Sequence, residues 1–319
     1  MRALVTGGCG FVGGHLIRHL LDSGDTVLGT ARDLERVADL TAQYQGSTWQ
    51  TLEITDPKAV LHCINTYRPE VIYHLAGIAF VPDAEENFES ALSVNVAGTH
   101  HVARACHLLQ TGIKVVLISS AETYGRISPS DLPITEKTPT RPSHNYSLSK
   151  LMAEQVLERF TQYGQMKGVV IRPFNHIGPG QSDKFVASNF ASQLVRMKAG
   201  RTSPVIRVGN LAAKRDFSDV RDIVRCYRLA AEKGEGIYNL GTGRAVSINL
   251  LLETLIAISG LKVSIETDPA RMRPAEIPEI YGIYEKAKRE LGWESTYSLR
   301  ETLESVYRDH ELRLRIASE

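Results

Sequence analysis

Short apolar runs alternate with amphipathic segments along the first half of the chain. An apolar run at residues 2–6 ends in glycines, residues 13–23 carry leucine and isoleucine at helical spacing, and a second apolar run covers residues 25–30. Apolar positions three and four residues apart favour an amphipathic helix, and short apolar runs bounded by glycine favour buried strands. The start of the chain therefore predicts a β-α-β unit.

The same alternation continues to residue 172. It predicts helices at residues 34–45, 57–67, 91–110 and 146–163, and strands at residues 48–52, 71–75, 114–119 and 168–172. Alternating strands and helices imply an α/β fold, a doubly wound parallel sheet of the Rossmann type with its ligand crevice at the carboxyl ends of the strands. Gly7, Ala76 and Ser120 each fall at such an end.

The pattern loosens after residue 172, where we expect a smaller C-terminal domain to begin. Residues 173–181 form a Gly/Pro-rich loop, and residues 205–222 are rich in charge. Further helices are predicted at residues 185–199, 248–259 and 299–313, and strands at residues 237–240 and 263–267. We expect residues 1–172 to form the first domain, a segment of about 216–243 to return to its sheet, and residues 173–319 to form most of the second.

Composition excludes several classes of function. Lysine and arginine number 37 against 36 aspartates and glutamates, so no bulk positive field attracts nucleic acid or an anionic membrane. No stretch is long and apolar enough to span a bilayer, and residues 2–5 run into glycines without the pattern of a signal peptide. We therefore expect neither a nucleic-acid partner nor a membrane, and a cytoplasmic location.

The four cysteines give no sign of a metal centre. Their positions are scattered without a paired spacing, which argues against both a zinc site and a disulfide framework. We expect reduced, buried thiols and no bound metal.

A glycine-rich turn follows the first strand. Gly7, Gly10 and Gly13 have the spacing G-x-x-G-x-x-G and open the first helix, with Phe11 and Val12 between the last two glycines. Glycines here allow a tight turn, a close approach of a pyrophosphate and close helix packing. The turn predicts a dinucleotide site, although a glycine-rich connector alone has the same appearance.

The end of the second strand bears on the choice of dinucleotide. An acidic residue there binds the adenosine ribose of NAD, whereas an arginine suits the 2′-phosphate of NADP. The chain reads Leu28-Gly-Thr-Ala-Arg32, and Asp33 follows. We favour NADP(H) because of Arg32, with NAD(H) left open if the loop brings Asp33 to the ribose or if Arg32 is only a surface residue.

Tyr146 and Lys150 form the strongest catalytic signal. Side chains four residues apart share one face of a helix, so an ammonium near the phenol lowers the pKa of Tyr146. Ser120, at the end of a strand, orients a carbonyl or hydroxyl for proton transfer by the tyrosine. Such a pair on a helix surface is common, but together with Ser120 and the glycine turn it predicts a proton relay beside a hydride carrier.

These residues together resemble the extended branch of the short-chain dehydrogenase/reductase superfamily, over nearly the whole chain. The segments His74-Leu-Ala-Gly77 and Asn95-Val-Ala-Gly-Thr99 match the superfamily's pattern. The resemblance implies an NAD(P)-binding domain at residues 1–172. It adds the following residues to the cofactor site: Ile54, Asp56, Leu75 and Ala76.

Three further segments are similar to GDP-mannose 4,6-dehydratases and GDP-4-keto-6-deoxy-mannose reductases, namely residues 172–181, 208–217 and 273–276. The resemblance implies a GDP-linked hexose as substrate, bound mainly by residues 173–319, and a homodimer formed through helices 91–110 and 146–163. It implies Arg215 and Arg273 on the diphosphate and Glu276 on the ribose, as suits the charges of a nucleoside diphosphate. Asn175, Gln181 and Asn189 complete the implied substrate site. An alternative for Arg215 is a salt bridge to Asp216, Asp219 or Asp222.

The stretch from Ser119 to Gly125 separates reductase from dehydratase. A 4,6-dehydratase needs acid and base groups beyond the relay. Glu122 occupies the position of the dehydratase base, but Ala121 replaces a residue that donates a hydrogen bond. We therefore predict NAD(P)H-dependent reduction of the C4 ketone of GDP-4-keto-6-deoxy-D-mannose to GDP-D-rhamnose or its C4 epimer. The alternatives are a GDP-mannose 4,6-dehydratase, another nucleotide-sugar epimerase or dehydratase, and a non-catalytic dinucleotide-binding protein.

Overall fold

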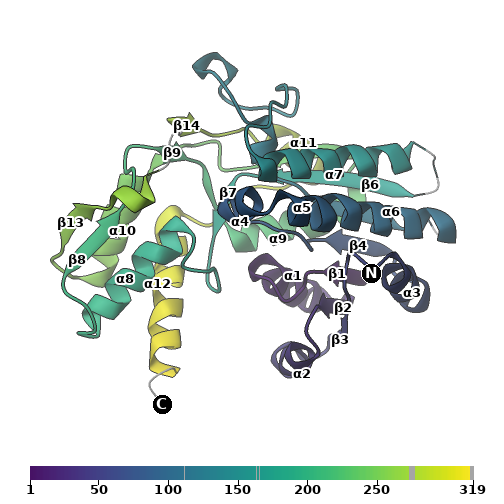
Figure 1. The fold of residues 1–319 in the computed structure, drawn as a ribbon, viewed down its shortest axis with the longest axis horizontal. Helices are drawn as coiled ribbons and strands as arrows, with labels where there is room; N and C mark the ends of the chain where they lie inside the picture. The colour runs from purple at the N-terminus through teal and green to yellow at the C-terminus, as the bar shows by residue number, and fades with distance from the viewer. Residues whose placement is uncertain (111, 163, 165, 273–276, 317–319) are drawn as a thin grey trace.

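A seven-stranded sheet lies at the centre of the computed structural model, which describes residues 1–110, 112–162, 164, 166–272 and 277–316. The strand order is β11-β6-β5-β4-β1-β2-β3, and every neighbouring pair is parallel. The strands are β1 (Arg2–Thr6), β2 (Thr26–Ala31), β3 (Thr48–Thr51), β4 (Val71–His74), β5 (Lys114–Ile118), β6 (Lys167–Pro173) and β11 (Gly236–Leu240) (Figure 1). The predicted doubly wound parallel sheet is confirmed.

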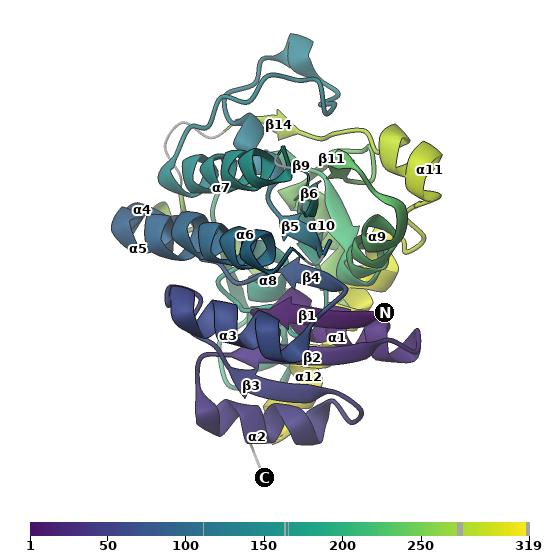
Figure 2. The same cartoon turned by 90° about the vertical axis from the view of Figure 1, so that its right-hand side faces the viewer.

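Helices cover both faces of the sheet. One face is covered by α3 (Pro57–Tyr67), α6 (Gly98–Leu109) and α7 (Asn145–Thr161), and the other by α1 (Phe11–Asp22), α9 (Val220–Lys233) and α11 (Glu285–Leu291), as Figure 2 shows. Helix α2 (Leu34–Gln43) packs beside β3.

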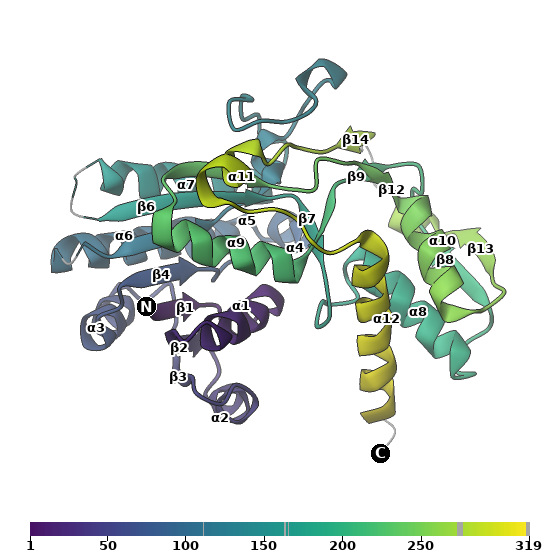
Figure 3. The same cartoon turned by 180° about the vertical axis from the view of Figure 1, so that it is seen from behind.

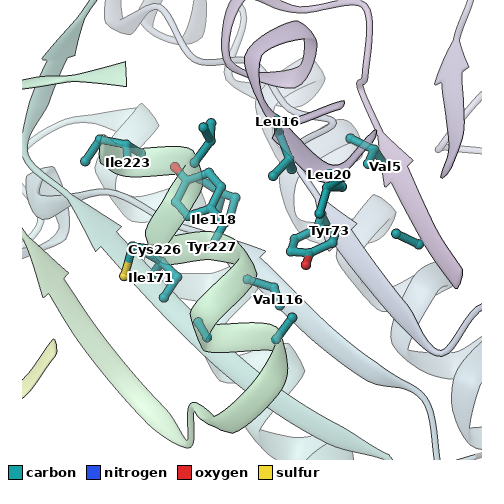
Figure 4. Close-up of a cluster of buried hydrophobic side chains, with 14 of the residues drawn as sticks. Val5, Leu16, Leu20, Tyr73, Val116, Ile118, Ile171, Ile223, Cys226 and Tyr227 are labelled. Atoms are coloured by element: carbon teal, nitrogen blue, oxygen red, sulfur yellow. The ribbon is translucent and has the colours of Figure 1, made fainter. Parts of the chain in front are cut away.

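Side chains that alternate along each strand pack against the helices on one face of the sheet and then the other. In β5, Val115 and Leu117 join one buried cluster, whereas Val116 and Ile118 join the other. Figure 4 shows the second cluster, in which Leu16 of α1 and Tyr227 of α9 lie against the sheet. Because side chains alternate across a strand, a strand buried on both faces is apolar throughout.

The remaining segments form a smaller unit beside the sheet (Figure 3). Its core lies among α8 (Val186–Lys198), α10 (Ile248–Ser259) and α12 (Leu299–Ile316). Short strands pair around it: β7 (Asn175–Ile177) with β10 (Phe217–Asp219), β8 (Val205–Val208) with β13 (Ser264–Thr267), and β9 (Lys214–Arg215) with both β12 (Val246–Ser247) and β14 (Glu279–Ile280). A short 3₁₀ turn covers Pro269–Arg271.

The helix expected at residues 91–110 is present, and one helix was not predicted. The chain runs without a break from α5 (Phe88–Ala91) through a π-helical turn, Leu92–Ala97, into α6. The helix that was not predicted is α9, which begins at Val220. Asp219 caps that helix by accepting a hydrogen bond from the amide of Arg221, at 2.8 Å.

Two loops carry further short elements. The loop after β4 holds α4 (Val81–Glu86), and the loop between β5 and α7 holds two 3₁₀ turns, Ala121–Tyr124 and Pro129–Asp131. The four cysteines are free, as predicted, and three of them, Cys63, Cys106 and Cys226, are buried.

Candidate active site

The glycine turn between β1 and α1 forms a cradle for an anion. Gly7 has φ of +68°, and a Cβ atom there would lie 2.7 Å from the backbone nitrogen of Ala76. A Cβ at Gly13 would lie 2.6 Å from the carbonyl oxygen of Gly8. No side chain caps α1 at Gly10, and the first turn of the helix carries no acidic residue. The amides at this helix start therefore suit the pyrophosphate of a dinucleotide.

Phe11 connects the cradle to the loop that follows β6. Its ring stacks on that of His176, with centroids 6.2 Å apart and planes 9° apart. Nearby, Nε2 of His15 lies 2.7 Å from the carbonyl oxygen of Pro179. The start of α1, with Phe11 and Val12 half-buried, thus contacts the segment predicted to bind substrate.

Arg32 is exposed directly after β2, and the next residue, Asp33, caps a helix. The Asp33 carboxylate caps α2 by accepting a hydrogen bond from the amide of Glu35 at 2.9 Å. Asp56 likewise caps α3 through the amides of Lys58 and Ala59. At this edge the Asp33 carboxylate is therefore used in a helix cap, whereas the Arg32 side chain is exposed.

The end of β4 meets the cradle through Thr6. Its hydroxyl bonds Nδ1 of His74 at 2.7 Å and accepts from the amide of Ala76 at 3.3 Å. Burial, aided by the charge of Lys150, lowers the pKa of His74 to about 3, so this ring is neutral. Leu75 and Ala76 are half-buried beside it.

Ile54 follows β3 and is buried against α6. A Cβ at Gly98 would lie 3.0 Å from its Cγ1 atom, so Ile54 packs closely on α6.

Ser120 and Tyr146 meet at the carboxyl end of β5. Ser120 begins the 3₁₀ turn Ala121–Tyr124, and its hydroxyl accepts from the amide of Glu122 at 3.1 Å. Tyr146, in the first turn of α7, is buried and hydrogen-bonded to Ser120. The predicted serine and tyrosine are therefore in contact.

Lys150 follows Tyr146 one helical turn later and is also buried. Its ammonium donates to the carbonyl oxygen of Ile118 at 2.7 Å, at the last residue of β5. A Cβ at Gly77 would lie 3.5 Å from Nζ of Lys150 and 2.9 Å from Oδ1 of Asn95, so only glycine leaves this approach open.

The prediction that Lys150 lowers the pKa of Tyr146 is wrong. Burial raises the pKa of Tyr146 to about 12. The hydrogen bond with Ser120 opposes this rise in pKa, and the negative charge of Glu122 adds to it. Burial also lowers the pKa of Lys150 to about 8, although Glu154 opposes it. Desolvation disfavours the charged form of both groups, so the phenol is a fully protonated donor at neutral pH.

The carboxylate of Glu122 lies near this relay and has a basic partner. Its Oε2 atom is 3.1 Å from Nε2 of His144, the residue that caps α7. Ala121, beside it, is buried in a small apolar cluster with Tyr124, Ile134 and Phe174. Position 121 therefore contributes no polar group to the site.

A buried ion pair joins α7, the helix that carries Tyr146 and Lys150, to the sheet. Arg172, in β6, donates to Glu154 of α7 at 3.0 and 2.5 Å, and both side chains are almost fully buried. Ser119 also donates to Glu154, and the Arg172 guanidinium lies over the ring of Tyr124 at 4.8 Å. The network thus joins α7, β6 and the turn that follows Ser120.

The predicted substrate residues lie apart from the relay, on the smaller unit and its connecting loop. Asn175 is exposed on β7, and buried Gln181 donates to the carbonyl oxygen of His176 at 3.0 Å. Asn189, on α8, accepts from Arg271 at 2.7 Å. Arg273 and Glu276 lie outside the described residues.

Arg215, on β9, donates to the carbonyl oxygen of Lys214 at 2.8 Å. The aspartates considered as its alternative partners bind other groups: Asp216 binds Thr242, Asp219 binds Arg221, and Asp222 binds Arg225.

Comparison with known proteins decides the family. A family model described as GDP-mannose 4,6 dehydratase matches residues 4–306. The chain belongs to this family. A GDP-6-deoxy-D-mannose reductase of Pseudomonas aeruginosa is 33% identical over 319 residues, which cover 98% of each chain. The family lies within the extended short-chain dehydrogenase/reductases, so the chain is an NAD(P)-dependent oxidoreductase of that type.

Solved structures of this superfamily superpose on nearly the whole chain. The structure of RMD from Pseudomonas aeruginosa complexed with NADPH has a TM-score of 0.84 at 29% identity and covers 98% of this chain and 100% of its own. A UDP-glucose 4-epimerase of Thermus thermophilus in complex with NAD has a TM-score of 0.85 at 26% identity, over 97% and 99% of the two chains.

Among its described helices, this family member has none long and apolar enough to cross a membrane. The described residues also contain no group of three or more histidine, cysteine, aspartate or glutamate side chains placed to hold a metal ion.

Sequence reasoning missed three buried or half-buried polar residues around the relay. Asn95 lies in the π-helical turn, accepts from the amide of Ile78 at 2.8 Å and donates to Ser149 at 2.9 Å. His144 and Glu154 make the contacts given above. A polar residue inside an apolar helical face was the signal for Glu154, whereas nothing in the sequence links His144 to Glu122.

Lys150 is expected to limit stability. Its pKa falls on folding from 10.5 to about 8, so the unfolded chain binds the proton more tightly, and stability rises as pH increases from 8 to 10.5. At pH 7 the charged ammonium lowers the free energy of unfolding by the full amount of about 3 kcal/mol. Lys150→Met removes this cost but loses the hydrogen bond to Ile118, so we expect a net gain of about 1–2 kcal/mol in the free energy of unfolding.

Urea unfolding at pH 7 and at pH 10 measures this effect. The gain is expected to shrink at pH 10, and exposed Lys262→Met serves as the control with unchanged stability. A Lys150→Met protein less stable than the wild type at pH 7 contradicts the assignment.

Proposed function

We propose that the protein uses NADPH to reduce the C4 ketone of GDP-4-keto-6-deoxy-D-mannose, giving a GDP-6-deoxyhexose such as GDP-D-rhamnose. The observation that carries the proposal is the buried Tyr146 phenol, hydrogen-bonded to Ser120 and protonated at neutral pH. A protonated donor is what ketone reduction requires. The 33% identity to a GDP-6-deoxy-D-mannose reductase supports the substrate class.

The residues present suit a nicotinamide dinucleotide. Gly7, Gly10 and Gly13 leave room for the pyrophosphate at the start of α1. Buried Ile54 and half-buried Ala76 are proposed to contact the rest of the dinucleotide. When bound, the reduced nicotinamide supplies the hydride that reaches C4.

The relay then supplies the proton. Ser120 hydrogen-bonds the C4 oxygen, and Tyr146 transfers its phenolic proton to that oxygen as the alkoxide forms. Lys150 provides an ammonium one turn along the same face of α7, and its bond to Ile118 fixes this position against the sheet.

The nucleotide sugar is assigned to the loop after β6 and to the smaller unit. The Oε1 atom of Gln181 is buried without a hydrogen-bond partner among the described residues, which suits an oxygen that accepts from a ligand. Asn175, Asn189 and Arg215 are proposed to bind the diphosphate, the sugar or the base, with the charge of Arg215 suited to a phosphate.

GDP-mannose 4,6-dehydratase is the second candidate, because Glu122 lies where that reaction needs a base. The apolar surroundings of Ala121 weigh against it, since dehydration needs a further acid to help the C6 hydroxyl leave. An epimerase would use the same relay but return the hydride to the sugar it came from.

Two incubations separate these reactions. We expect NADPH to be consumed only when the 4-keto sugar is supplied, and expect no 4-keto product from GDP-mannose with NADP alone. Tyr146→Phe should lower kcat/KM about 10²- to 10⁴-fold through loss of the proton donor. Tyr67→Phe, at the far end of α3, is the control that should stay within twofold. A keto product from GDP-mannose without added reductant would overturn the reductase assignment.

The preference for NADPH rests on Arg32. Its exposure after β2 and the capping role of Asp33 support a site that accepts a 2′-phosphate. Arg32→Ala is expected to raise KM for NADPH about tenfold, with KM for NADH unchanged as the internal control, because one charged phosphate contact is lost. Equal effects on both dinucleotides would show that Arg32 does not contact the 2′-phosphate.

The enzyme is also proposed to be a homodimer that pairs through α6 and α7. These helices lie side by side, and a hollow of about 650 Å³ between them is lined by both apolar and charged side chains. The apolar ones include Leu108, Met152 and Val156, and Arg104 is among the charged ones. A second copy covering this face would bury them. Sedimentation velocity at micromolar concentration should give a species of about twice 35.3 kDa, and a sole species of 35 kDa would contradict the dimer.

A further inference from the structure

A histidine at the start of α7 contacts the carboxylate beside the relay. His144 lies 22 residues after Glu122 in the chain, yet its Nε2 atom is 3.1 Å from Oε2 of Glu122. The His144 ring is stacked with that of Tyr146, with centroids 6.0 Å apart and planes 11° apart. His144 therefore touches both the proton donor and the only carboxylate that the resemblance assigned to chemistry in this turn.

The hydrogen bonds assign the proton on the imidazole. Nδ1 of His144 lies 3.1 Å from the amide nitrogen of Ser147, and an amide N–H only donates. Nδ1 must therefore accept and carry no proton, which leaves the proton of the neutral ring on Nε2. The contact with Glu122 is thus an Nε2–H donating to a carboxylate oxygen.

Glu122 is held at two points. Its amide donates to Ser120 at 3.1 Å, and its carboxylate accepts from His144. The loop between Glu122 and His144 is closed at its base by two backbone hydrogen bonds. The amide of Arg141 donates to the carbonyl oxygen of Tyr124 at 3.1 Å, and the amide of Arg126 donates to the carbonyl oxygen of Arg141 at 3.0 Å. This loop projects at the top of Figure 1. The turn therefore fixes the backbone of Glu122, and the contact with His144 restrains its carboxylate.

A free carboxylate at this place would threaten the proposed reaction. The ketone at C4 makes the C5 hydrogen acidic, so a base can break the C5–H bond, with the proton going to the carboxylate and the electron pair moving to the C4 oxygen as an enolate. Return of a solvent proton would exchange the hydrogen and put the configuration at C5 at risk. A reductase gains from a carboxylate that cannot make this approach.

We propose that His144 is a positioning residue that restrains Glu122 beside Tyr146 and so keeps it from acting as a base at C5. The inference rests on the proposed reduction of a 4-keto sugar. Held in this place, the charge of Glu122 adds to burial in raising the pKa of Tyr146. The same carboxylate that serves a dehydratase as base thereby serves this site as a fixed charge.

His144→Asn tests the proposal while preserving the helix cap, because asparagine is a good N-cap but is too short to reach Glu122. The protein is incubated in D₂O with the 4-keto sugar and NADP, which donates no hydride, and deuterium at C5 is followed by NMR. We expect exchange about tenfold faster than in the wild type. Adding Glu122→Gln should return it to the wild-type rate. Unchanged exchange in His144→Asn, or fast exchange that survives in the double variant, overturns the proposal.

Ser147→Ala is the matched control for damage to the helix start. The Ser147 hydroxyl accepts from the amides of Ser143 and His144, both at 3.2 Å, so its loss weakens the same cap but leaves the imidazole in place. C5 exchange should match the wild type. In ordinary turnover with NADPH, His144→Asn should lower kcat several-fold while KM stays within twofold, since the substrate contacts are untouched.

A second measurement does not depend on the substrate. Nitrogen-15 NMR of the His144 ring should find a protonated Nε2 and a bare Nδ1 at neutral pH, and the reverse tautomer would overturn the proposal directly. Failure of the wild type to oxidise NADPH with the keto sugar would instead refute the proposed function, and the two failures are thus distinguishable.

Discussion

The buried pair of Glu154 and Arg172 connects the central sheet to α7, the helix of the proposed relay. Both side chains are nearly inaccessible to water, and Glu154 also accepts from Ser119, the neighbour of Ser120. Removing one partner of such a pair leaves an uncompensated charge, at a cost of about 3–5 kcal/mol, whereas apolar replacement of both is often neutral. The pair is therefore best understood as fixing the relation of α7 to β5 and β6, and not as a large net source of stability.

That fixed relation sets the chemistry of the site. With α7 held against the end of β5, Tyr146 meets Ser120 and Lys150 meets the carbonyl of Ile118. Burial then shifts both pKa values toward the neutral forms, upward for the phenol and downward for the ammonium. A protonated tyrosine suits a site that gives a proton to a new alkoxide. The lysine remains a source of strain, because a charged ammonium in this place is poorly solvated.

Much of this arrangement could be predicted from local pattern. Helical spacing and glycine turns located β1, α1 and the sheet, and the four-residue spacing of Tyr146 and Lys150 placed them on one face. Contacts between distant segments could not be predicted in the same way. The bond from His144 to Glu122 depends on how the loop between them closes, and the π-helical turn around Asn95 depends on packing against α7. Charged residues on the exposed face of α9 concealed its apolar stripe, because periodicity is hard to recognise in a short charged segment.

In the proposed reaction, the relay around Tyr146 supplies the proton that completes the delivery of hydride to C4 of a keto sugar. The most direct measurement uses NADPH deuterated at the transferring position of the nicotinamide, with the 4-keto sugar as acceptor and NMR of the isolated product. We expect one deuterium at C4 for each dinucleotide oxidised, in a single configuration. Oxidation of the dinucleotide with no deuterium at C4, or deuterium found at C6, would contradict it.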